Sequence, residues 1–187
     1  MPSTPNKVEF GISELHIGTY NVAADSTVTL GTPYAQKGAV SFSPETQSEK
    51  NDFYADNIIY WSGYSGGSIE GDLEVALFDD DFKKQFLGYV ELTGGGIAQI
   101  KNATKPNTYI AFQVDGDSQK RRILIYNCAL GDINREYATI EDSKEPATET
   151  IPVTATGDNA TGITLVVYKP GDTAYDTLFT APPVPAL

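Results

Sequence analysis

Apolar and polar residues alternate along much of the chain in short runs, separated by Gly, Pro, Asn and Asp. The clearest run covers residues 68–78. One of its two faces is apolar and carries Ile69, Leu73, Val75 and Leu77. The other face is acidic and carries Glu70, Asp72 and Glu74. A period of two predicts a strand with one face on a core and one in water.

Other runs rich in Val, Ile, Thr and Tyr have the same character. They cover residues 7–22, 38–43, 108–114, 119–130, 147–156 and 163–169. The Asp115-Gly116 pair between two of these runs is a strong β-hairpin signal. Short strands at such spacing predict a mainly β fold, an antiparallel β-sandwich or barrel.

Residues 79–88 break the strand pattern and predict one short flanking helix. Asp79 or Asp80 can cap its start, acidic residues suit its N-terminal dipole, and Gly88 suits its C-terminal exit. Phe82 and Phe86 are four residues apart, so we expect both to face the domain.

The segment from Phe53 to Trp61, FYADNIIYW, has large apolar residues on both faces if it is extended. The preceding residues 43–51 are polar and read as a loop, and the glycine-rich residues 62–67 read as a joint. A surface strand has one wet face. We therefore expect this segment either to run through a core or to be covered by something else.

Length, charge and cysteine content restrict the possible domain organisation, partners and cellular location of the protein. The 187 residues predict a single β domain over residues 1–170, with an assembly loop at about 43–66 and a Pro-rich C-terminal tail at 171–187 that is not packed. The net charge of −12 argues against nucleic-acid binding. Neither a leader nor a membrane-length apolar run is evident, so we expect synthesis in a cytoplasm. Cys128, the single cysteine, reads as a buried small hydrophobe.

No catalytic or metal-binding motif occurs in the sequence. The single histidine, His16, reads as a strand or surface residue without a catalytic partner. Asp79, Asp80 and Asp81 suit a helix start better than a calcium loop, whose spacing is missing. We therefore expect no enzyme activity, cofactor or metal. The basic run Lys120 to Arg122 is either a solubilising rim or a docking contact for acidic groups of a neighbour.

Several segments, taken in order, carry a resemblance. They are KVEFGISELHIG, GAVSFSPE, FYADNIIYW, GDLEVALFDDDFKKQFLG, KRRILIYNCAL and EDSKEPATETIPVTAT. Over residues 7–169 the chain resembles the major tail proteins, or tail tube proteins, of long-tailed non-contractile bacteriophages of Gram-positive hosts. The resemblance implies a β-sandwich or barrel with a short helix, a loop or arm that reaches adjacent subunits, and hexameric rings stacked into a tube for DNA.

The resemblance also implies the partners of the chain: other copies of itself, a tape-measure protein and tail-end proteins. It places the protein in the virion, without a membrane, and DNA is expected to pass through the tube without specific binding. On that basis the acidic face of Glu70, Asp72 and Glu74 is expected to line the lumen. The expected subunit-interface residues are Phe53, Tyr54, Ala55, Asp56, Asn57, Tyr60, Trp61, Arg121 and Arg122. Residues Ile58 to Trp61 could still belong to a core strand.

Three alternatives stay open from the sequence. One is another tail, connector or baseplate component of the virion. A second is a carbohydrate-binding β-sandwich in which Tyr54, Tyr60, Trp61 and Tyr64 stack on sugars. The third is an acid-base hydrolase, because paired carboxylates meet in space rather than in sequence.

Overall fold

The computed structural model describes residues 11–116, 119–137 and 146–187, and residues 7–10 of the first expected strand therefore lie outside it. The described strands are β1 (Gly11–Val22), β2 (Val28–Leu30), β3 (Tyr34–Ala35), β4 (Ala39–Phe42), β5 (Glu45–Ala55), β6 (Ile58–Val75), β7 (Val90–Glu91), β8 (Ile97–Ala98), β9 (Thr108–Asp115), β10 (Arg122–Leu130), β11 (Asn134–Arg135), β12 (Glu149–Ala155) and β13 (Leu165–Tyr168). The described helix is α1 (Asp80–Phe86). Within the described residues, no helix has both the length and the apolar character needed to cross a membrane.

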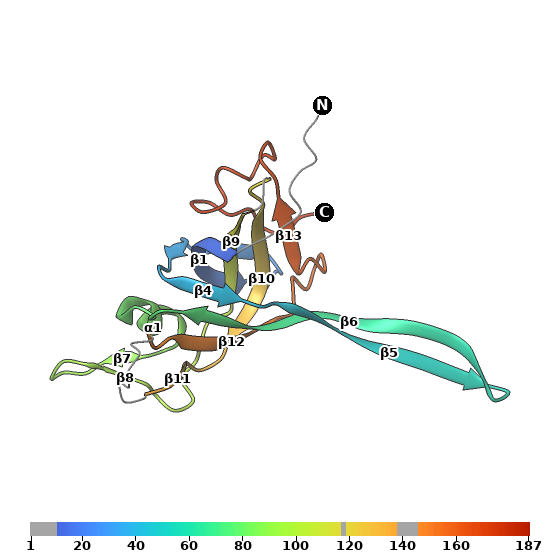
Figure 1. Cartoon of the computed structure of the whole chain (residues 1–187), viewed down its shortest axis with the longest axis horizontal. Coiled ribbons are helices and arrows are strands. Elements are labelled where there is room, and N and C mark those ends of the chain that lie inside the picture. Colours follow the sequence, from blue (N-terminus) through green and yellow to red (C-terminus); the bar gives the residue numbers. More distant parts are fainter. Residues whose placement is uncertain (1–10, 117–118, 138–145) are drawn as a thin grey trace.

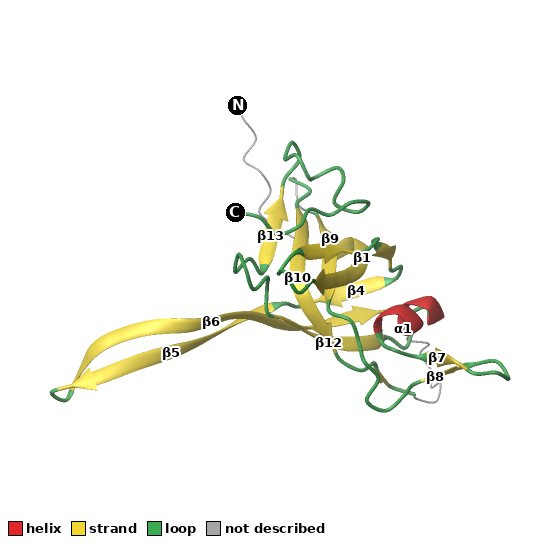
Figure 2. Ribbon diagram, turned by 180° about the vertical axis from the view of Figure 1, so that it is seen from behind, coloured by secondary structure: helices red, strands yellow, loops and turns green. Residues whose placement is uncertain are grey.

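One antiparallel sheet forms the body, in the order β2-β1-β9-β10-β12-β6-β4, and β7 pairs with β8 in a second, small sheet. The large sheet bends so that β1 and β9 lie across a common core from β6 and β12 (Figure 2). β5 adds to β6, and β13 adds to β10. The predicted mainly β antiparallel fold with one short helix is confirmed.

The central strands β9 and β10 are buried on both faces, so they supply two apolar clusters. Ile110 and Ile125 point into the main core with Leu73 of β6, while Tyr109 and Tyr126 point into a second cluster. The hairpin predicted around Asp115-Gly116 is confirmed by the β9–β10 pairing. Cys128 is fully buried in the main core, as expected.

The helix α1 closes one end of the main core with aromatic side chains. Phe82 and Phe86 are fully buried, and the ring of Phe82 lies 4.7 Å from that of Phe78. Asp79 is the N-cap residue, but its side chain makes no capping bond and instead accepts a hydrogen bond from the Tyr34 hydroxyl at 3.1 Å. Gly88 has a φ of +69° just after the helix, which suits its expected place at the exit.

The polar residues 43–51, expected to be a loop, mostly belong to a strand. β5 and the first half of β6 form a long two-stranded hairpin that projects from the body (Figure 1). We call residues 45–67 the arm. Asp56 and Asn57 form its turn with φ values of 52° and 61°, and positive φ at both central residues defines a two-residue type I′ turn.

Three details of the strand predictions are therefore wrong. The glycines of residues 62–67 do not separate two strands, because β6 runs without a break from Ile58 to Val75. Ile58 to Trp61 are not a core strand, since they lie on the arm away from the body. Leu77 is 61% exposed, because β6 ends at Val75 and the alternation stops there.

The C-terminal segment is packed, contrary to the expectation for residues 171–187. Residues 173–183, which we call the strap, cover the second apolar cluster, where Leu178 is fully buried. The Tyr126 hydroxyl donates to the Pro183 carbonyl at 2.9 Å, and the Phe179 ring stacks on His16 at 4.7 Å. The strap buries the side chains of Tyr175 and Leu178 and half of Phe179, all of which precede the prolines at 182, 183 and 185.

Candidate functional site

The arm exposes large apolar side chains on both of its faces. Directly paired residues of antiparallel strands share a face. Phe53 pairs with Trp61 on one face, while Tyr54 pairs with Ile59 on the other. The exposed fractions range from 50% to 75%. They belong to Phe53, Tyr54, Ile58, Ile59, Tyr60, Trp61 and Tyr64.

Polar contacts hold the arm in shape without a core. Asp52 accepts a hydrogen bond from the Ser62 hydroxyl at 2.6 Å and pairs with the Lys50 ammonium at 2.9 Å. These two donors, Ser62 first, lower the pKa of the Asp52 carboxyl. Asn51 donates to Ser65 at 2.6 Å across the strands. The arm is thus a formed hairpin that presents its apolar groups to the outside.

The turn residues complete the predicted interface segment. Ala55 pairs with Ile58 at the last rung, and Asp56 and Asn57 follow it. The indole of Trp61 lies over Gly63, where a Cβ would approach the ring to 2.5 Å. Glycine at this position therefore lets the indole lie flat along the strand.

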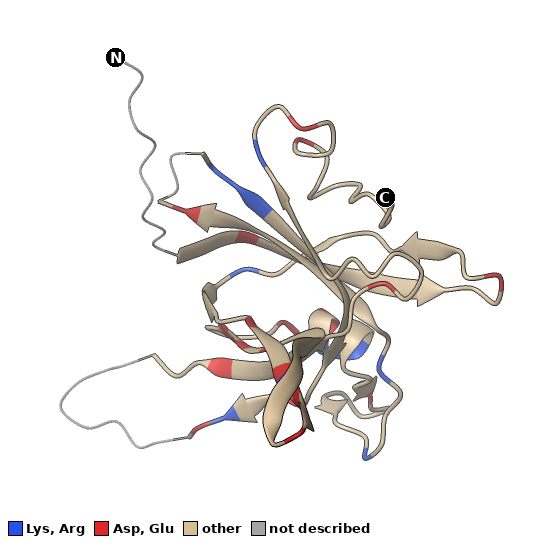
Figure 3. Ribbon diagram, turned by 90° about the vertical axis from the view of Figure 1, so that its right-hand side faces the viewer, with Lys and Arg blue, Asp and Glu red and all other residues tan. Residues whose placement is uncertain are grey.

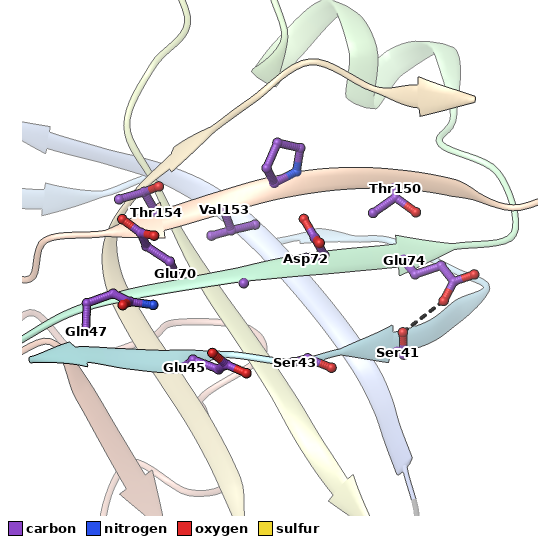
Figure 4. A pocket seen from close by; sticks show the side chains of 12 residues that line it. Ser41, Ser43, Glu45, Gln47, Glu70, Asp72, Glu74, Thr150, Val153 and Thr154 are labelled. Atoms are coloured by element: carbon purple, nitrogen blue, oxygen red, sulfur yellow. Dashed lines mark hydrogen bonds between the residues drawn. The ribbon is translucent and has the colours of Figure 1, made fainter. Parts of the chain in front are cut away.

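The acidic residues of β6 lie together on the open face of the sheet formed by β12, β6, β4 and the start of β5 (Figure 4). Glu70 and Asp72 are exposed and Glu74 is half-buried, whereas their neighbours Ile69 and Leu73 face the core. This face holds a shallow hollow of about 670 Å³. Its lining includes Ser41, Glu45, Glu70, Asp72, Glu74 and Thr154.

Two features of this face were not found in the sequence. Glu45 of β5 lies directly opposite Glu70, so like charges are paired across the strands. Glu74 accepts hydrogen bonds from the Thr148 hydroxyl at 2.6 Å and the Ser41 hydroxyl at 2.9 Å, which lower its pKa. The arm's turn alone could not have revealed this pair: a two-residue turn at Asp56 and Asn57 would place Glu45 opposite Ser68, and two register shifts along the hairpin move its partner to Glu70.

Arg121 and Arg122 do not lie with the arm. Both are half-buried at the start of β10. The Arg122 guanidinium lies 4.1 Å from the Tyr175 ring and 4.5 Å from the Phe179 ring, so it contacts both strap side chains. Arg122 also donates from Nε to Gln113 at 3.2 Å. Its present contacts therefore hold the strap to the sheet.

The described residues contain no group of three or more His, Cys, Asp and Glu side chains placed to hold a metal ion. Burial raises the pKa of the Cys128 thiol, which keeps it protonated. The ring of His16 stacks on Phe179, and its Nδ1 lies 2.8 Å from the Glu14 carbonyl oxygen.

Acidic residues outnumber basic ones on the ribbon (Figure 3).

Comparison with known proteins identifies a matching family. A family described as "Phage tail tube protein" matches residues 4–164. No curated protein matches the chain. Among solved structures, the anti-feeding prophage cap, a tube terminating cap, is 8% identical, with 90% of this chain and 98% of that chain covered and a TM-score of 0.50.

Two further structures come from an extracellular contractile injection system in its extended state. Its sheath-tube complex is 10% identical, with 87% and 94% of the two chains covered and a TM-score of 0.47. Its sheath/tube terminator is 8% identical, with 87% and 98% covered and a TM-score of 0.49. At such identities the likeness concerns the fold alone. It rests on the tube terminating cap, whose TM-score is 0.50.

Proposed function

This chain belongs to the phage tail tube protein family, and from that premise we propose that it forms rings of six subunits, joined by the arm and lined by the acidic face. Members of this family are structural proteins of the phage tail, not enzymes, and they self-assemble into tubes. In this proposal the arm holds neighbouring subunits together, and the acidic face lines the channel through which DNA passes.

The arm carries this proposal. An isolated two-stranded hairpin is at best marginally stable in water, and monomers rarely expose many large apolar side chains together. The seven exposed side chains of the arm are explained if neighbouring subunits cover them. Tyr and Trp are also the residues most enriched where binding energy concentrates. We assign Phe53 to Asn57, Tyr60 and Trp61 to a subunit interface, with Arg121 and Arg122 at a second contact through the β10 end.

The acidic face explains how DNA could move through the tube. Glu45, Glu70, Asp72 and Glu74 recur on one face, so a ring would repeat these charges around its lumen. Two like charges about 4 Å apart in water repel by about 1 kcal/mol. A phosphate backbone would slide past such a wall without sequence-specific binding. A tape-measure protein inside the lumen and tail-end proteins at its ends would be the other partners.

Removal of the arm tests the proposal. Residues 50–64 are replaced by the turn Asn-Gly, which connects Glu49 to its cross-strand partner Ser65 by a two-residue loop. Because the core residues are untouched, we expect a folded monomer that forms neither rings nor tubes in negative-stain microscopy. The matched control is Val167→Ser, which removes an exposed apolar side chain from β13 and leaves the arm in place. Normal tubes from the armless variant would overturn the proposal.

A further inference from the structure

The strands β7 and β8 lie at the end of the molecule opposite the arm (Figure 1), and a second exposed apolar surface is found there. It belongs to residues 88–105, which include β7 and β8 and which we call the β7–β8 lobe. Val90, Leu92 and Ile100 of the lobe are 43% to 51% exposed. The fold of the body does not require these apolar groups on the surface, so a contact with another molecule is the simplest reason for them.

The lobe is held firmly to the body. The Lys105 ammonium donates to the Gly131 carbonyl at 2.7 Å and pairs with Asp132 at 2.7 Å. Within the lobe, the Leu92 amide donates to the Gly96 carbonyl at 3.0 Å and closes the β7–β8 turn. The apolar side chains are therefore carried by a fixed scaffold, as a preformed binding surface requires.

A hollow of about 480 Å³ lies in the lobe, lined by Ile100, Lys101, Lys105 and their neighbours. Its rim combines the apolar side chain of Ile100 with the exposed ammonium of Lys101, whereas the charge of Lys105 is balanced by Asp132, which also lines the hollow. The arm has the complementary composition: aromatic rings together with the four acidic residues Glu45, Glu49, Asp52 and Asp56, of which Asp52 pairs with the single basic residue, Lys50. Complementary charge beside buried aromatic anchors is the usual basis of a specific contact.

We propose that the β7–β8 lobe is the acceptor for the arm of the next copy of this chain in the ring. An arm at one end and its acceptor at the other make a heterologous contact, which closes into a ring when the rotation between copies allows it. The aromatic tip of the arm covers Leu92 and Ile100, and Lys101 faces the acidic groups of the arm. This inference rests on the proposed function, because it names the partner surface of the same arm.

Paired cysteines test the contact. The chain suits this experiment because Cys128, its single native cysteine, is buried and unreactive. Ala55→Cys marks the arm and Thr93→Cys marks the lobe, and both leave the apolar side chains in place. Assembled protein is treated with a short bis-maleimide and separated on a denaturing gel. The double variant is expected to give a ladder of covalent multimers, because each subunit joins two neighbours, whereas each single variant stays monomeric.

The outcomes separate this inference from the proposed function. Dimers from Ala55→Cys alone mean that arm meets arm, and a ladder from Ala55→Cys combined with Lys120→Cys means that the arm docks at the basic end of β10. Either result, with tubes still present, overturns the acceptor assignment alone. Absence of tubes from the unmodified chain overturns the proposed function and this inference with it.

Charge reversal provides a second measurement. Lys101→Glu places a carboxylate against the acidic arm, so we expect the protein concentration needed for tube formation to rise about tenfold or more, with unchanged thermal unfolding of the monomer. The matched control is Lys169→Glu, the same change at an exposed site near β13. Equal assembly of the two variants would contradict the proposed acceptor.

Discussion

At the scale of single residues, a buried carboxylate ties the helix end to the sheet. Glu149 accepts a hydrogen bond from the Phe78 amide at 2.8 Å and pairs with Arg135 at 2.6 Å. The Lys83 ammonium, itself buried, lies 4.0 Å from the same carboxylate. The group is thus the anionic centre of a cluster that the sequence pattern did not reveal, since its three partners are distant in sequence.

Replacement of Glu149 by Gln should lower the free energy of unfolding by about 3 kcal/mol, because Arg135 loses its charge partner and the buried Lys83 ammonium keeps only the exposed Asp80 carboxylate at 3.7 Å. Urea denaturation of the monomer measures this. Glu91→Gln is the control: Glu91 is exposed and its pair with Lys84 is long, so about 0.5 kcal/mol or less is expected. A similar loss in both variants would show that burial is not the cause.

A second buried carboxylate gives the stability a pH dependence. Burial alone would raise the pKa of Asp158, but hydrogen bonds from the Tyr20 hydroxyl at 2.6 Å and from Thr161 lower it overall. A lowered folded-state pKa contributes stability that is present above the unfolded pKa, ordinarily 3.8, and is lost as the pH falls through the folded value.

The variant Asp158→Asn should therefore be less stable than the parent at pH 7 but should lose less stability between about pH 4 and pH 2. Urea midpoints at both ends of that range measure the difference. If the two proteins follow parallel curves, the hydrogen bonds to Asp158 do not favour its charged form.

At the scale of elements, alternation predicted the strands that have a core on one side. β12 and the body half of β6 show a strict period of two because Ile151 and Leu73 face the main core while their neighbours face out. The hairpin of β9 and β10 was predictable from Asp115-Gly116. Such patterns arise wherever burial selects the residues of one face.

The arm was only partly predictable because it has no buried face. Its base is polar on both sides and is held by cross-strand bonds such as that of Asn51 with Ser65, which leave no periodic signal. Its aromatic tip was recognised as unusual and assigned to a neighbour. The possibility that Ile58 to Trp61 belong to a core strand is excluded, because the long β5–β6 pairing carries them away from the body.

The packing of the strap could not be predicted, because its buried Leu178 and half-buried Phe179 stand among polar residues and prolines without a helix or strand period. Leu178 fills a site between the strap and the outer face of β9 and β10, so Leu178→Ala should lower the free energy of unfolding by about 3 kcal/mol. Thermal or urea unfolding measures the change. Val184→Ala, at a half-exposed position beyond the strap, is the control and should be nearly neutral. Equal effects would mean that the strap adds no stability.

At the scale of the whole molecule, the chain belongs to the phage tail tube protein family. The resemblance to tail tube proteins is confirmed by the family match over residues 4–164. A structural role in the phage tail replaces the hydrolase and the sugar-binding hypotheses. Neither the arm contact nor the lumen could be read further from one chain, because both surfaces acquire their surroundings only from other copies.

The acidic face can be tested in assembled particles. Glu70→Lys, Asp72→Lys and Glu74→Lys together should leave rings intact but slow or stop DNA delivery, since a cationic lumen would hold phosphates by charge. Tube microscopy and DNA ejection assays measure both steps. The control reverses three exposed charges elsewhere: Glu14→Lys, Glu136→Lys and Asp176→Lys. Unchanged delivery with the first set would refute the electrostatic role.

The unbroken course of β6 constrains how this chain can change in evolution. The same strand carries the acidic face in the body and the apolar side chains of the arm, so one inserted residue between them would turn every following side chain to the other face unless a bulge absorbs it, as two bulges of β6 opposite β5 already do. An insertion of two residues in β6, matched by two in β5, would instead preserve both faces. Natural variation in arm length is therefore expected to proceed either by even numbers in both strands at once or by single residues that form further bulges.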